Sequence, residues 1–138
     1  MKIEYYDGNK ENTVGKIILR EGITSIEDDA FEHCDKLEKI VFPDSLISIG
    51  NLSFSDCFNL KEVELPENLI SLGNGAFAYC SNCYNLEEII FPKNLTSIGD
   101  KAFWDCINLK KITYHQNTED ILKDYFGKYF DEFEKIVI

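Results

Sequence analysis

Prolines and phenylalanines recur at a fixed spacing, and this period constrains the fold more than any other feature of the chain. The three prolines are separated by 23 and 26 residues, and four of the phenylalanines by 23, 23 and 26. The two series are Pro43, Pro66 and Pro92, and Phe31, Phe54, Phe77 and Phe103. Self-similarity at such a period predicts a repeat architecture, in which stacked units bury a continuous core.

Each proline closes a segment in which apolar residues occupy positions one, four and six. The segments read LEKIVFP (37–43), LKEVELP (60–66) and LEEIIFP (86–92), with diverged copies LKKITYH (109–115) and VGKIILR (14–20). Alternation of positions four and six predicts a strand with one buried face. Proline ends such a strand because it lacks the N–H needed for a ladder and restricts φ.

A second motif follows each strand and carries a small residue, a phenylalanine and a cysteine. The copies are ITSIEDDAFEHC (23–34), LISIGNLSFSDC (46–57), LISLGNGAFAYC (69–80) and LTSIGDKAFWDC (95–106). The recurring Gly50, Gly73 and Gly99 indicate a turn or a close backbone approach. The one interval of 26 residues places a three-residue insertion near residues 79–83.

The combined pattern resembles the BspA-like leucine-rich repeat family, because the proline, the IG pair and the AF…C run occur together over about residues 14–115. The resemblance implies an α/β fold: a right-handed leucine-rich-repeat solenoid with a parallel sheet on its concave face. It also implies short helical or irregular turns on the other side. The implied function is non-catalytic protein binding, of adhesion type, on the surface of host-associated microbes.

The two ends of a solenoid must be covered, so we expect one domain over residues 1–138 with a cap at each end. Residues 1–13 form the N-terminal cap, where KIEYY followed by Asp7-Gly8 predicts a strand and a hairpin turn. Four to five repeats occupy residues 14–115.

Residues 116–138 are predicted to form a helical C-terminal cap that Thr118 begins as N-cap. Apolar side chains then fall on one helical face: Ile121, Leu122, Tyr125, Phe126, Tyr129, Phe130 and Phe133. A membrane-surface or partner-binding helix is the alternative, and the acidic polar face of the helix disfavours anionic lipid.

The charge balance excludes some classes of partner. Lysine and arginine number 14 against 25 acidic residues, a formal net charge of −11. Nucleic-acid binding needs a basic patch, and anionic membranes repel such a chain. The chain contains no run of about 18 apolar residues, so we expect no membrane-spanning helix. No signal peptide is visible in this chain. The location is therefore open: cytoplasmic as written, or cell surface or secreted, as the resemblance implies, if a leader was removed.

The cysteines and histidines are the candidates for chemistry. One repeat position holds a thiol: Cys34, Cys57, Cys106 and either Cys80 or Cys83. A thiol repeated in register is most simply a small buried side chain. Cys80 and Cys83 form a CxxC, but a structural zinc site needs four ligands and no second pair exists. His33 precedes Cys34 without any orienting group or catalytic motif, so we expect no enzyme, metal or cofactor.

The solvent-facing side of the predicted sheet, on the concave face of the solenoid, is the candidate binding surface. The third and fifth residues of the strands belong to it: Lys16, Ile18, Lys39, Val41, Glu62, Glu64, Glu88, Ile90, Lys111 and Thr113. The fifth residues should face solvent but are mostly apolar or β-branched. Strand propensity explains this, and so does a contact stripe for a protein partner. We expect a protein partner and a monomer or weak self-association; the alternative is a structural or self-assembling repeat protein without a separate ligand.

Overall fold

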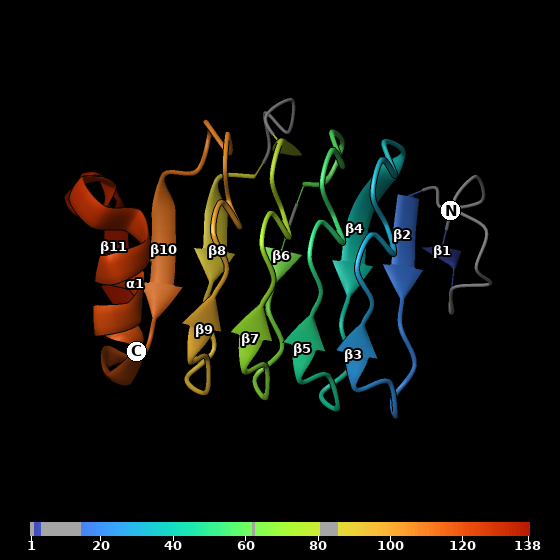
Figure 1. Ribbon diagram of the computed structural model, residues 1–138, viewed down its shortest axis with the longest axis horizontal. Coiled ribbons are helices and arrows are strands. Elements are labelled where there is room, and N and C mark those ends of the chain that lie inside the picture. Colours follow the sequence, from blue (N-terminus) through green and yellow to red (C-terminus); the bar gives the residue numbers. More distant parts are fainter. Residues whose placement is uncertain (1, 4–14, 62, 81–85) are drawn as a thin grey trace.

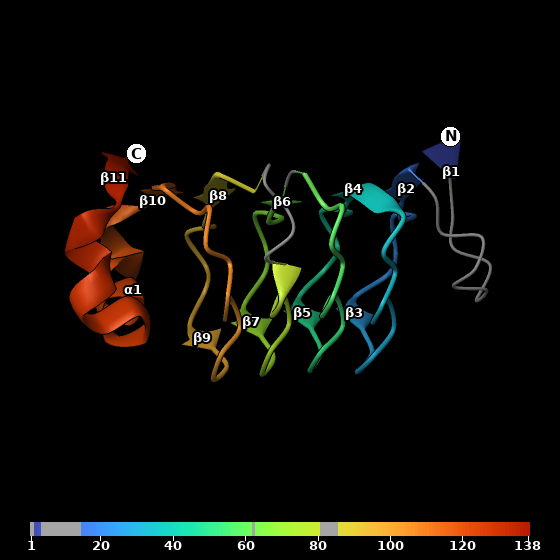
Figure 2. The same ribbon diagram turned by 90° about the horizontal axis from the view of Figure 1, so that it is seen from above.

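The computed structural model describes residues 2–3, 15–61, 63–80 and 86–138, which form two rows of parallel strands (Figures 1 and 2). The row that we call the long row contains β1 (Lys2–Ile3), β2 (Gly15–Ile18), β4 (Leu37–Val41), β6 (Val63–Glu64), β8 (Glu88–Ile90), β10 (Lys111–Tyr114) and β11 (Glu134–Val137). The second sheet contains β3 (Ser25–Ile26), β5 (Ser48–Ile49), β7 (Ser71–Leu72) and β9 (Ser97–Ile98).

The long row pairs equivalent residues of successive repeats. Lys16 pairs with Lys39 and Ile89 with Val63, and all these pairings are parallel. Between β4 and β6 the Lys61 N–H donates to the Glu38 carbonyl at 2.8 Å, which continues the row. The α/β leucine-rich-repeat solenoid implied by the family resemblance is confirmed.

The second sheet differs from the irregular or helical turns expected on that side. The Ser-Ile or Ser-Leu pair before each turn forms a two-residue strand, with Ser48 paired to Ser25 and Ser71. The Gly50 N–H donates to the Ile26 carbonyl at 2.8 Å, and the next repeat repeats this bond. Strands form here because stacked turns lie at strand spacing and satisfy one another's backbone groups.

The repeated phenylalanines stack into a phenylalanine ladder, Phe31–Phe54–Phe77–Phe103. Successive ring centroids lie 5.1, 5.1 and 5.7 Å apart, with interplanar angles of 4°, 5° and 1°. Each N–H of the first three donates to the carbonyl of the residue before the next phenylalanine. The ladder therefore joins neighbouring repeats by ring contact and by backbone hydrogen bonds.

The repeat position of the thiol belongs to Cys80. Its Sγ donates to the Phe54 carbonyl at 3.5 Å, as Cys57 does to Phe31 at 3.2 Å. Cys34, Cys57 and Cys80 are buried, which confirms their predicted role as core side chains, and Cys106 is partly exposed. Cys83 lies outside the described residues, so the CxxC is not described as a unit.

The C-terminal cap is only partly helical. Helix α1 spans Glu119–Phe126 and is flanked by 3-10 turns at Gln116–Thr118 and Gly127–Glu132. The predicted helical cap is present, but Gly127, with φ of +56°, ends α1, and a 3-10 helix continues to Glu132 in place of the α-helix. Thr118 occupies the N-cap position, but its hydroxyl donates to the His115 carbonyl instead of capping the helix. Residues beyond the turn form β11, a strand at the edge of the long row.

The cap nevertheless keeps the repeat register. Glu134 of β11 pairs with Lys111, 23 residues earlier. Phe126 lies 23 residues after Phe103, and their rings are 6.4 Å apart at 23°. The Phe103 N–H donates to the Tyr125 hydroxyl oxygen at 2.8 Å, where other repeats supply a carbonyl. The cap is thus a modified repeat in which a helix replaces the second turn and covers the core.

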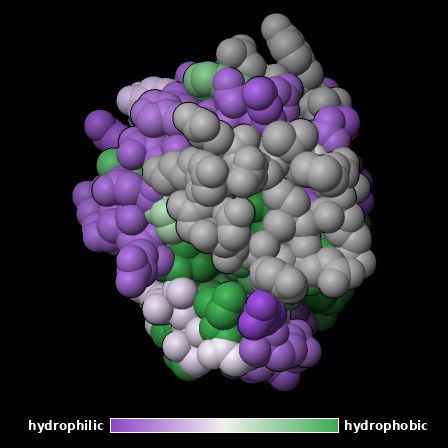
Figure 3. Space-filling view, turned by 90° about the vertical axis from the view of Figure 1, so that its right-hand side faces the viewer, coloured by the Kyte–Doolittle hydropathy of each residue, from purple (hydrophilic) through white to green (hydrophobic). Residues whose placement is uncertain are grey.

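The N-terminal end adds a strand to the long row. Strand β1 pairs with β2 in parallel, with Lys2 opposite Lys16. The strand predicted over KIEYY is present at Lys2–Ile3. The turn at Asp7-Gly8 lies outside the described residues. Figure 3 views this end, where hydrophobic side chains of the described part are visible between hydrophilic ones.

A tyrosine–glutamate pair joins the last repeat to the cap. The buried Tyr114 hydroxyl donates to Glu119 Oε1 at 2.9 Å. Burial, the hydrogen bond to Glu119 and the charge of Glu119 together raise the pKa of Tyr114 to about 12, and burial has the largest effect. The same hydrogen bond lowers the pKa of Glu119 against the opposing effect of burial.

We predict that Glu119→Gln destabilises the protein in a pH-dependent way. A carboxyl whose folded pKa is depressed stabilises above its unfolded pKa of about 4.3, and this contribution is lost as pH falls through the folded pKa. Urea unfolding at several pH values should therefore show a stability difference from wild type that is full near pH 7 and shrinks in acid. Asp124→Asn on the exposed side of α1 is the control. A difference that stays constant down to pH 3 would contradict the prediction.

Candidate protein-binding surface

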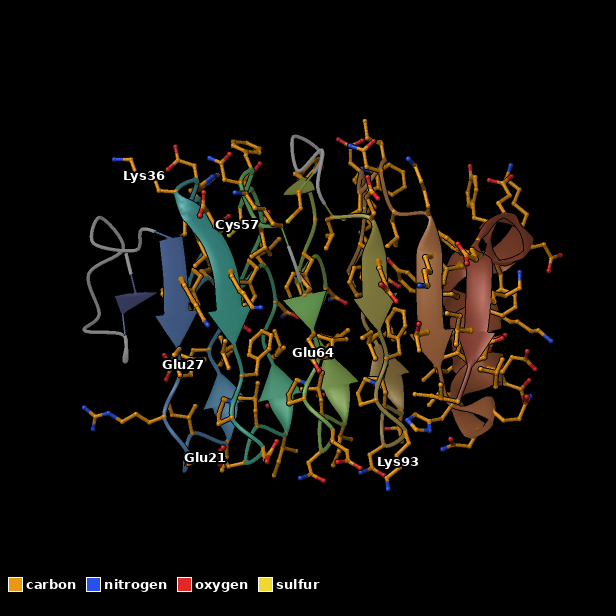
Figure 4. All side chains as sticks on the ribbon, turned by 180° about the vertical axis from the view of Figure 1, so that it is seen from behind. Glu21, Glu27, Lys36, Cys57, Glu64 and Lys93 are labelled. Atoms are coloured by element: carbon orange, nitrogen blue, oxygen red, sulfur yellow. The ribbon has the colours of Figure 1, made fainter. Side chains whose placement is uncertain are left out.

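The predicted contact residues lie together on one side of the long row, which we call the sheet face. Figure 4 looks onto it, with Glu64 near the middle and Lys93 at the lower edge. Strand β4 shows the cause: Leu37 and Ile40 are buried, whereas Lys39 and Val41 are partly exposed. The sheet face also brings together the remaining predicted residues that are at least partly exposed: Lys16, Ile18, Glu64, Glu88, Ile90 and Lys111. Glu62 lies outside the described residues.

Thr113 departs from the expected exposure. Only 8% of it is accessible, because β11 places Ile136 beside it and its hydroxyl donates to Glu88 Oε1 at 3.0 Å. It therefore supports the neighbouring carboxylate and offers little surface to a partner. The sequence did not indicate this because β11 was expected to be helical.

The charges on and beside the sheet face are partly paired between neighbouring strands. Lys111 Nζ lies 3.5 Å from Glu88 Oε1, and Lys61 Nζ lies 3.2 Å from Glu38 Oε1. The second pair joins opposite charges at equivalent positions of two successive repeats. Exposed pairs of this kind contribute little stability, about 0–1 kcal/mol, so their main effect is on register and surface charge.

A groove of about 390 Å³ opens at the carboxyl ends of β4, β6 and β8. Val41 and Ile90 flank Glu64 along it, and Pro66 and Pro92 also contribute to its lining. Ile90 is 36% exposed, which leaves an apolar side chain accessible beside Glu64. The groove can therefore contact an apolar side chain of a partner and a charge next to it.

The groove includes residues that the sequence analysis did not name as binding residues. Pro66, Pro92 and His115 hold the seventh position of each repeat, two residues after the predicted contact column. In a parallel sheet, residues at one repeat position lie side by side across the strands. Positions five and seven both lie near the carboxyl ends of the strands, so considering them together could have located the groove.

The histidine and the cysteine that were considered for catalysis differ in their exposure to solvent. Cys34 is buried in the core, whereas the His33 side chain is 68% exposed and lies 3.5 Å from Asp56. The exposed imidazole therefore lies near a carboxylate, whereas the thiol belongs to the core. Among the described residues no three His, Cys, Asp or Glu side chains are grouped to hold a metal ion.

Two strand rows, a phenylalanine ladder and a 23-residue register define a leucine-rich-repeat solenoid. The family profile described as "BspA type Leucine rich repeat region (6 copies)" matches residues 3–132, and the chain belongs to this family. Its six copies extend beyond residues 14–115, where four to five repeats were expected. The modified repeat at the C-terminus accounts for part of this extension.

Three solved structures are similar over most of the chain. A leucine-rich repeat protein of Bacteroides ovatus is 30% identical, with a TM-score of 0.73 over 90% of this chain and 30% of its own. The T. pallidum leucine-rich repeat protein is 30% identical, with a TM-score of 0.67, and the match covers 71% of this chain and 44% of that protein. A leucine-rich cell surface protein of Faecalibacterium prausnitzii is 28% identical, with a TM-score of 0.69, and the match covers 82% of this chain and 29% of that protein.

The chain thus spans less than half the length of each of these proteins. A comparison with curated proteins gave no match. The helices among the described residues are too short or too polar to cross a membrane.

Proposed function

We propose that the chain is a non-catalytic protein-binding module that uses the sheet face for adhesion or another protein–protein interaction. The observation that carries the proposal is the groove in which Val41 and Ile90 remain accessible on either side of Glu64. The similarity to a cell surface protein supports a location outside the cell. Leucine-rich-repeat solenoids present such extended faces to partners.

The charges of the groove favour one kind of partner segment. Among the described residues of its lining, the carboxylates Asp44, Glu64 and Glu67 outnumber the lysine, Lys39. An apolar side chain would contact Val41 and Ile90, and a lysine or arginine beside it would meet the carboxylates. Complementary charge at the rim acts mainly on the association rate and on specificity.

The double substitution Val41→Lys with Ile90→Lys is predicted to weaken partner binding at least about tenfold, because it removes two apolar contacts and adds two charges. A photo-crosslinking residue at position 64 identifies the partner, and surface plasmon resonance then measures its affinity. The matched control is Ile47→Lys with Ile70→Lys, since these isoleucines are 44% and 43% exposed beside the second sheet. Equal affinities of the two double variants would rule out the sheet face.

Self-assembly is the second candidate, and the edge strand β11 favours it. Its four residues are exposed, and Ile136 and Val137 are 39% and 48% accessible. An uncovered strand edge can pair with another chain. Light scattering that gives a mass rising with concentration would support this candidate, whereas a concentration-independent monomer would argue against it.

A further inference from the structure

A second groove, of about 720 Å³, lies between the last repeat turn and the C-terminal cap, and the proposed function does not use it. We call it the cap groove. Its apolar lining includes Trp104, Ile107, Leu109, Tyr125, Tyr129 and Phe133. It is separate from the sheet-face groove, with which it shares no lining residue.

The cap groove exists because the cap does not continue the regular turn. Ser55 and Ala78 follow their ladder phenylalanines and are each 2% exposed. Trp104 holds the equivalent position in the last repeat and is 53% exposed. At this position a large accessible ring replaces a small buried side chain. Packing within the repeat does not require a ring of this size.

Other apolar side chains are accessible around the same groove. Ile107 is 69% exposed and Tyr129 is 54% exposed. Single exposed apolar residues are common, but several lining one concave surface are typical of an interaction site. Tryptophan and tyrosine are also the residues most enriched in binding hot spots.

The polar atoms of these aromatic side chains are mainly hydrogen-bond donors. Within the described part of the chain, no acceptor is found for the Trp104 indole N–H or the Tyr129 hydroxyl. The Tyr125 oxygen accepts the Phe103 N–H, so its own proton remains to be donated. Burial raises the pKa of Tyr125, which favours the protonated, donating form.

The charged residues of the lining balance one another. Lys101 and Lys110 are offset by Asp105 and Glu132, although the whole chain has a formal charge of −11. Lys101 Nζ also lies 5.5 Å from the Trp104 ring centroid. A neutral ligand segment therefore matches this groove better than a highly charged one.

We infer that the cap groove binds an extended proline-rich segment of a partner protein. Proline residues supply carbonyl acceptors and no N–H donors, which matches a groove whose aromatic rings carry unpaired donors. Their flat rings pack on aromatic side chains, and the polyproline II helix is formed before binding. A helical peptide would use its carbonyls internally, and a β-strand would bring N–H groups that need acceptors.

The test is titration of a capped deca-proline peptide into the full chain. Trp104 is the single tryptophan, so its fluorescence reports binding at this groove. We expect a saturable fluorescence change for the wild type. Tyr129→Phe should lose about fivefold in affinity, because one hydrogen bond is lost. Trp104→Ala, whose binding is measured by calorimetry, should lose at least about tenfold. Tyr79→Phe is the matched control, because Tyr79 is 45% exposed and does not line the groove.

Three outcomes would overturn the inference. One is no saturable response to deca-proline at millimolar concentration. The second is tighter binding of an amphipathic helical peptide of equal length. The third is equal affinity of Tyr129→Phe and Tyr79→Phe. Val41→Lys with Ile90→Lys should still bind deca-proline, so a failure of the sheet-face proposal and a failure of this one are distinguishable.

Discussion

Replacing Phe77 by alanine is expected to lower the free energy of unfolding by about 3–5 kcal/mol. Phe77 is fully buried, and its ring stacks on Phe54 and Phe103 at 5.1 and 5.7 Å. Alanine removes both ring contacts and leaves a void between two repeats. Since each repeat of a solenoid is stabilised mainly by its neighbours, the loss would weaken the stack at its centre. A domain stable by about 5–15 kcal/mol would lose a large share of its stability.

Urea unfolding followed by circular dichroism measures this effect. Phe77→Leu is the control for size, because it keeps most of the apolar volume and should cost less than about 1.5 kcal/mol. Phe31→Ala is the control for position, since Phe31 lies in the first repeat of the ladder and stacks on Phe54. The ladder would lose its proposed importance if Phe77→Ala were no more destabilising than Phe77→Leu.

Gly73→Ala is expected to destabilise the protein by about 3 kcal/mol or more, by overpacking. A Cβ atom at Gly73 would lie 2.5 Å from the Asn51 nitrogen and 2.5 Å from the Gly50 carbonyl carbon. Both are backbone atoms of the preceding turn, so relief requires that the turns move apart. Such movement would disturb the bonds between β5 and β7. Without this contact, alanine would instead stabilise by reducing the entropy of the unfolded chain.

The first repeat provides the control for this prediction. Glu27 holds the position of the recurring glycine there, it is exposed, and β3 is the end strand of the second sheet. Among the described residues no other strand of that sheet lies beyond it, which explains why a side chain is tolerated. Glu27→Ala should change the free energy of unfolding by less than about 0.5 kcal/mol. Thermal unfolding that shows the same small change for Gly73→Ala would contradict the close approach of the turns.

The repeating part of the fold was predictable because the same contacts recur in every repeat. Phe54 and Phe77 lie one period apart, so their stacking follows once the strands are in register. The same reasoning places Lys39 and Val41 on the accessible side of their strand. The second sheet was not predictable, because a two-residue pair such as Ser48–Ile49 carries no strand period.

The cap and the cap groove were the least predictable parts. The apolar spacing from Ile121 to Phe133 is helical, yet Gly127 ends the α-helix, and the chain passes through a 3-10 helix before it forms a strand. That outcome depends on β10, which offers an edge for β11. Burial of Thr113 and exposure of Trp104 both follow from where the cap packs.

By itself, the sequence determined the period, the parallel register and the residues that fill the core, because identical units must bury identical apolar positions against each other. Only the tertiary structure decided how the series ends and which surfaces remain open. At the last repeat no identical neighbour follows, so packing between Phe103, Tyr125 and Phe126 replaces the repeat rule. The cap groove arises at that replacement.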